Sequence, residues 1–141
     1  MHDRRPTVRP VTPDDARSRW RHLRLDSDSP DLEIGDGVHA RIVMTSAVMV
    51  SKVTMAARAN QQERSHHGET LVLVLTGSAH ITIGGEAKML NADEVAIVPP
   101  GERYSLAAGD AGCTRLDVFT PPDMTLAEEA FHQEHANHGF E

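Results

Sequence analysis

From residue 38 onward the chain consists of short runs of β-branched and other apolar residues, and each run ends at turn-forming residues. Runs of this length and composition are typical of β-strands. The segment 78–83 alternates polar and apolar residues, as a half-buried strand does, and Gly84-Gly85 after it predicts a tight hairpin. No helical pattern separates the runs, so the sequence predicts an all-β sandwich, jelly roll or barrel and not a parallel sheet.

The regions on either side of this strand series have a different character. Residues 1–37 are rich in Arg, Asp, Pro and Gly, which predicts an irregular N-terminal arm and loop before a barrel at 38–122. After the barrel, Thr125 and Glu128 have the spacing of a capping box. The apolar residues that follow predict a short helix on the barrel exterior within the C-terminal segment 123–141.

Length, charge and cysteine content limit the class of protein. A chain of 141 residues is expected to form one domain with its own core. The net charge of −7 offers no basic surface to nucleic acid or to an anionic membrane, so the expected partner is a small-molecule substrate. The lone cysteine, Cys113, excludes an internal disulfide, and the first twenty residues lack the apolar run of a signal peptide. We therefore expect a cytoplasmic protein.

Two segments carry a resemblance to a known family. Residues 66–77, "HHGETLVLVLTG", and residues 93–104, "DEVAIVPPGERY", resemble the two motifs of the cupin superfamily, and the likeness extends over roughly residues 45–122. Gly77 and the Pro-Pro-Gly sequence at 99–101 are turn-forming residues of the kind that these motifs contain. The resemblance implies a jelly-roll β-barrel, and small cupins commonly pair, so a homodimer is expected.

The same resemblance implies where a metal would be bound. In the family, a His-x-His pair, a Glu or Gln, and a later His act as ligands, and these positions fall here on Arg64, His66, Thr70 and Tyr104. Only His66 is a retained ligand, and an arginine beside it opposes the binding of another cation. We therefore expect no metal cofactor; if a metal is bound, His66 is its ligand.

The replaced positions remain chemically useful. Side chains two apart on a strand share a face, so Arg64, His66, Thr70 and Tyr104 are expected to project into the barrel mouth. Arginine offers a fork for a carboxylate, histidine exchanges protons near neutral pH, and a tyrosine phenol can donate a proton or stabilise an oxyanion. Apolar pocket walls are expected from Val72 and Val74.

We hypothesise an enzyme that moves protons without a metal, by isomerisation, cyclisation or dehydration of an oxygenated organic intermediate. The predicted catalytic residues are Tyr104, His66 and Arg64, and the predicted substrate-binding residues are Arg64, Thr70, Val72 and Val74. Two other functions remain open: non-catalytic binding of a small molecule, and metal-dependent, dioxygenase-like chemistry with unusual ligands. Structural roles also remain open for Arg64, as a surface partner of Glu63, and for Tyr104, as a plug of the barrel mouth.

Overall fold

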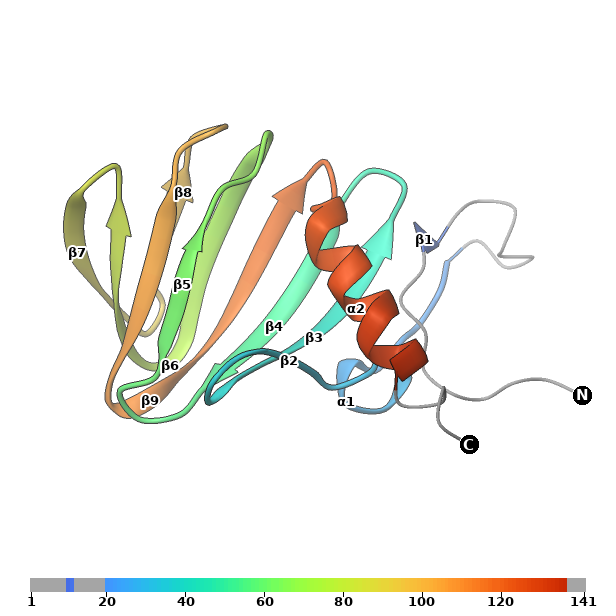
Figure 1. The fold of residues 1–141 in the computed structure, drawn as a ribbon, viewed down its shortest axis with the longest axis horizontal. Helices are drawn as coiled ribbons and strands as arrows, with labels where there is room; N and C mark the ends of the chain where they lie inside the picture. Colours follow the sequence, from blue (N-terminus) through green and yellow to red (C-terminus); the bar gives the residue numbers. More distant parts are fainter. Residues whose placement is uncertain (1–9, 12–19, 137–141) are drawn as a thin grey trace, which may run out of the picture.

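The computed structural model describes residues 10–11 and 20–136, and these form a jelly-roll β-barrel with one C-terminal helix (Figure 1). The all-β prediction is confirmed. All strand pairs are antiparallel except the short parallel pair of β1 with β3. The elements are β1 (Pro10–Val11), α1 (Leu25–Asp28), β2 (Leu32–Gly35), β3 (Val38–Thr45), β4 (Met49–Met55), β5 (Asn60–Arg64), β6 (Glu69–Ile83), β7 (Glu86–Asn91), β8 (Val95–Val98), β9 (Tyr104–Thr120) and α2 (Met124–Ala136).

Two long strands, β6 and β9, hold the barrel together. They pair with each other from Glu69↔Thr120 to Ile83↔Tyr104. The first half of β6 and the second half of β9 form one layer with β8, β4, β3 and β2. The other halves form the second layer with β7 and β5. Each long strand therefore belongs to both layers. The first motif runs into β6, and the second motif contains β8, which pairs with β6.

The long strands change layer at a pair of glycines. Gly77 has a φ of 75°, and it pairs with Cys113 next to Gly112, whose φ is 78°. A Cβ atom on Gly77 would lie 2.1 Å from the carbonyl oxygen of Gly112, so only glycine fits there. The register of the β6–β9 pair shifts on both sides of this point, which allows the strands to bend.

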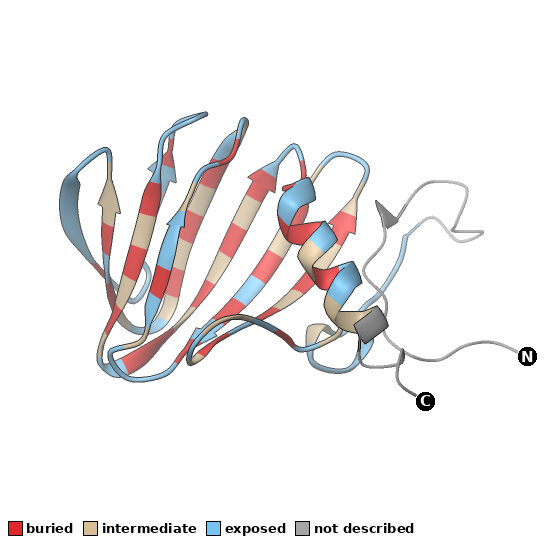
Figure 2. Ribbon diagram, in the orientation of Figure 1, coloured by how far each residue is buried: buried red, intermediate tan, exposed pale blue. Residues whose placement is uncertain are grey.

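Alternation along the strands sorts the side chains into an inner and an outer set, visible as coloured bands in Figure 2. Inward positions on β3, β4, β6 and β9 are buried, and Val72 and Val74 are both fully enclosed. No helix within the described residues is long and apolar enough to span a membrane. The buried inward positions of the strands make the barrel interior the first candidate region for a site.

The predicted boundaries need two corrections. The sheet begins before residue 38, because β2 pairs with β3 within the expected N-terminal arm. The capping box at Thr125 was wrong: the carboxylate of Asp123 accepts hydrogen bonds from the amides of Thr125 and Leu126, and α2 starts at Met124. A buried Asp reaches the same free amides one residue before the helix, so Thr125 is not needed as the cap.

Helix α2 lies across the seam between the two layers. Its Leu126, Ala127 and Ala130 belong to the same buried cluster as the barrel core. On its polar side, Glu129 contacts β5, an edge strand of the second layer. Gln133 contacts β2, an edge strand of the first layer. The helix thus closes an opening of the barrel, and does not simply rest on the outer face of a sheet.

Candidate functional site

A buried ion pair occupies the interior of the barrel. Alternation along β9 turns Arg115 and Asp117 inward, and their exposed fractions are 0% and 2%. Arg115 donates from Nε to one carboxylate oxygen of Asp117 at 2.9 Å and from Nη2 to the other at 3.2 Å. It also donates from Nη2 to the side-chain oxygen of Gln61 and from Nη1 to the sulfur of Met55. The pair is therefore fixed by partners on three strands.

This pairing makes the interior polar but electrically balanced. An isolated buried charge is strongly unfavourable, and removing one partner of a buried pair typically costs about 3–5 kcal/mol. Asp117 therefore neutralises Arg115, and Gln61 satisfies a further guanidinium donor. A ligand next to this cluster meets fixed hydrogen-bonding groups without a net charge.

Two inward hydroxyls have no partner. The hydroxyls of Ser51 and Thr70 are buried, and neither makes a hydrogen bond within the described structure. Ser51 lies opposite Asp117 on the β4–β9 pair, and Thr70 lies opposite Phe119 on the β6–β9 pair. A buried polar group without a partner costs about 1–3 kcal/mol. These hydroxyls are the groups that a small polar molecule in the barrel would satisfy.

Tyr104 is the first residue of β9. It is buried, and it lies opposite Arg64 on the β5–β9 pair. Burial raises the pKa of its phenol well above the ordinary value, and the negative charge of Asp117 raises it further, while Arg115 and Arg64 lower it. The phenol therefore keeps its proton at neutral pH and is available as a hydrogen-bond donor.

His66 is buried at the end of the barrel where β6 begins. Its Nε2 lies 2.7 Å from the carbonyl oxygen of Pro121, and its ring meets the edge of Phe119 with the ring centres 5.6 Å apart. A carbonyl only accepts hydrogen bonds, so Nε2 carries the proton. In the neutral ring, Nδ1 is then the atom with a free lone pair, and the backbone contact fixes this tautomer.

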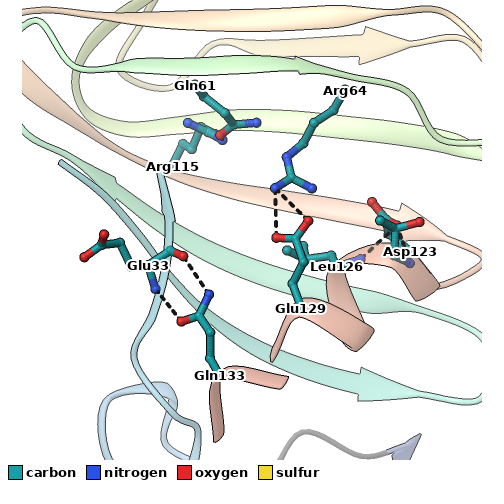
Figure 3. Close-up of polar contacts among 9 residues, drawn as sticks. Glu33, Gln61, Arg64, Arg115, Asp123, Leu126, Glu129 and Gln133 are labelled. Carbon is teal, nitrogen blue, oxygen red and sulfur yellow. Dashed lines mark hydrogen bonds and ion pairs between the residues drawn. The ribbon is translucent and has the colours of Figure 1, made fainter. Parts of the chain in front are cut away.

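Arg64 lies at the end of β5 and points toward α2 (Figure 3). Its Nη2 donates to both carboxylate oxygens of Glu129, at 3.1 and 3.3 Å. The two side chains line a polar pocket of about 310 Å³ together with Asp123, Thr125 and other residues of β5 and the following turn. The alternative pairing of Arg64 with Glu63 is not observed, because Glu63 is bound by Arg103.

The cupin signature extends over the strands that build this interior. Residues 51–119 match the cupin domain family. The chain is a cupin. A curated relative, the pectin degradation protein KdgF of Dickeya dadantii, is 25% identical to the cupin over 103 residues, which are 72% of this chain and 94% of that protein.

Solved structures show the same fold. An RmlC-like cupin of Shewanella frigidimarina has a TM-score of 0.65 at 21% identity, with 73% of this chain and 93% of that chain covered. Oxalate decarboxylase of Bacillus subtilis, which has Mn(II) centres, has a TM-score of 0.61 at 21% identity, with 67% of this chain and 28% of that chain covered. At this identity, the likeness establishes the fold of the cupin and not its chemistry.

The Mn(II) centres of oxalate decarboxylase raise the question of whether this cupin has residues for a metal. The described residues contain no group of three or more His, Cys, Asp or Glu side chains suited to one. Among the four motif positions only His66 is an ordinary ligand, and its Nε2 is bound to Pro121. The carboxylate of Asp117 is already bound by Arg115 and is not free to act as a ligand. The residues present therefore do not fit the family's metal.

The sequence prediction missed the residues at the centre of the site. Arg115, Asp117, Gln61 and Ser51 were not among the predicted site residues, whereas Tyr104, His66, Thr70, Val72 and Val74 are all buried. A signal was present, because Arg115 and Asp117 are in phase with the buried Cys113 and Phe119. Charged residues at the inward positions of an apolar strand indicate a buried polar cluster.

The state of Tyr104 can be tested directly, because it is the chain's only tyrosine. Its folded pKa is raised, so an unfolded chain loses the phenolic proton first, and stability should fall as the pH rises above about 10. In a near-ultraviolet absorbance titration, phenolate should appear only together with alkaline unfolding. The urea-unfolded chain is the control and should titrate near pH 10. Phenolate formation near pH 10 with the fold intact would contradict the buried placement.

Proposed function

We propose that this cupin is an enzyme that transfers protons on a small oxygenated organic acid without using a metal. One observation carries the proposal: two buried, unpartnered hydroxyls, on Ser51 and Thr70, lie on strands that pair with β9, where the buried charges of Arg115 and Asp117 neutralise each other. Such a polar interior suits a molecule rich in hydroxyl or carbonyl groups. The missing metal ligands suggest that protein groups perform the chemistry.

The side chains at the motif positions are assigned complementary roles. Nδ1 of His66 is the candidate base, because Nε2 is committed to Pro121. The phenol of Tyr104 is the candidate donor to a substrate oxygen, because its raised pKa keeps the proton in place. Arg64 is the candidate partner of the substrate carboxylate, with Thr70 as a hydrogen-bonding contact and Val72 and Val74 as the apolar wall.

These roles support a balanced isomerisation. His66 removes a proton from a carbon next to a carbonyl group, the C–H electron pair forms the enol double bond, and the carbonyl oxygen takes the proton of Tyr104. The deprotonated carbon must carry a hydroxyl group, so that the intermediate is an enediol. His66 then gives its proton to the former carbonyl carbon, the second enediol hydroxyl gives its proton to Tyr104, and its oxygen becomes the new carbonyl. Neither an oxidant nor a reductant is required, and both side chains return to their starting states.

The named relative suggests the substrate class. KdgF of Dickeya dadantii is described as a pectin degradation protein, and pectin is built largely from sugar acids. A monomeric sugar acid combines hydroxyl groups for the barrel interior with a carboxylate for Arg64. We therefore propose sugar acids as the first substrates to test, with D-galacturonate as the first probe.

Non-catalytic binding is the second candidate. It is favoured by one observation, the saturation of Arg115 by partners within the chain, which makes the interior rigid. The two candidates differ in whether the ligand exchanges a proton. A ligand that binds and is recovered without any exchanged hydrogen would support the second candidate.

Proton transfer can be measured before any product is known. We expect the enzyme to incorporate deuterium from D₂O into D-galacturonate or a related keto sugar acid. The loss of the exchanging proton's signal in proton NMR spectra measures the rate. Tyr104→Phe, which keeps the ring, should lower the rate by about 10²-fold or more, and His66→Gln should do the same. His80→Gln is the matched control, because His80 is exposed on the outer face. Unchanged exchange in Tyr104→Phe, with an unchanged melting temperature, would remove Tyr104 from the mechanism.

We also propose a cytoplasmic homodimer. The single cysteine is compatible with a reducing compartment. Exposed Val95 and Ile97 on β8 lie in register beside the half-buried outer residues of β6 and β9, including Leu71 and Val118, and so extend an apolar outer face. Sedimentation velocity should show a dimer that Ile97→Glu converts into a monomer. A wild-type monomer at micromolar concentration would contradict this assembly.

A further inference from the structure

The position of α2 across the barrel seam has a consequence for access to the interior. Arg64, the candidate partner of a substrate carboxylate, is already bound to a carboxylate of the chain itself, that of Glu129 (Figure 3). The side chains of Arg64 and Glu129 are 19% and 37% exposed. The ion pair therefore lies at the surface, where a dissolved anion can reach it.

Two kinds of contact between the described residues help to hold the helix. A second polar clamp joins Gln133 to the backbone of Glu33 on β2: the amide of Glu33 donates to Gln133 at 2.9 Å, and Gln133 donates to the carbonyl of Glu33 at 2.7 Å. The buried apolar face consists of Leu126 and two alanines, Ala127 and Ala130. An alanine buries little surface, so this face contributes less than a row of large apolar side chains would.

The pocket beside the ion pair provides room for a ligand. Its volume is about 310 Å³, and its walls come from both the barrel and α2. Arg64 brings the only positive charge among its lining residues, while Glu63, Asp123 and Glu129 are acidic. An organic anion entering this pocket would find one attractive group, and Glu129 already holds it.

We infer that α2 is a lid over the barrel and that Glu129 is an internal competitor, which occupies Arg64 until the carboxylate of a ligand displaces it. The inference rests on the proposed function only for the nature of the ligand. Displacement exchanges one carboxylate for another, so the charge around Arg64 is conserved. It breaks the polar contact between α2 and β5 and leaves the Gln133 clamp and the small apolar face to hold the helix. Ligands without a carboxylate cannot release the lid in this way.

The test compares Glu129→Gln with Glu128→Gln in the full-length chain. Both variants remove one negative charge from adjacent positions of α2, but Glu128 is exposed and lies outside the pocket lining. Glu129→Gln should speed hydrogen exchange of the α2 amides by about threefold to fivefold, and D-galacturonate should bind more tightly by a similar factor. Glu128→Gln should match the wild type in both measurements, and amides of β6 and β9 should not change.

Two further measurements make the outcome decisive. Gln133→Ala, which leaves Arg64 and Glu129 intact, should also speed exchange in α2, and saturating D-galacturonate should speed it in the wild type. If Glu129→Gln exchanges and binds like Glu128→Gln, or if ligand slows exchange in α2, the lid is overturned. If no variant binds D-galacturonate while Glu129→Gln still exchanges faster, the ligand class of the proposed function fails. The role of the Glu129–Arg64 ion pair in holding the lid then still stands.

Discussion

The buried pair of Arg115 and Asp117 is the interaction on which the rest of this cupin depends. Both residues lie on β9, the strand that belongs to both layers, and they are enclosed by β4, β6 and Gln61 of β5. A guanidinium in this position is tolerated only because a carboxylate and an amide face it. Through Gln61, the pair therefore ties strands of the two layers together, and it commits the carboxylate of Asp117 to Arg115.

This constraint explains how a cupin can lose metal ligands without losing a usable pocket. Arg64, Thr70 and Tyr104 stand at the positions to which the family resemblance assigns the other three ligands. Burial keeps Tyr104 protonated, and the hydroxyl of Thr70 is buried without a hydrogen-bond partner. Arg64 is held at the rim by a helix that lies outside the matched family segment.

Local patterns predicted the fold because the responsible forces are local. Val72 and Val74, expected to form an apolar wall, are buried, whereas Gly77, expected to end a strand, lies at a bend within the single strand β6. The pattern failed where partners are distant in sequence. Glu129 meets Arg64 across 65 residues, and the Arg115–Gln61 contact spans 54. Asp123 was overlooked as the helix cap because the spacing of Thr125 and Glu128 also satisfied a capping rule. Which of two adequate caps is used depends on the burial of Asp123.

The central claim is that the polar interior binds and processes a small acid without a metal. The most direct measurement is calorimetric binding of D-galacturonate to protein treated with EDTA and checked by elemental analysis, before and after addition of Mn²⁺. The account predicts the same affinity with less than about a tenth of an equivalent of transition metal bound, because the residues at the motif positions do not form a ligand set. Loss of binding on chelation, with recovery on addition of Mn²⁺, would contradict it.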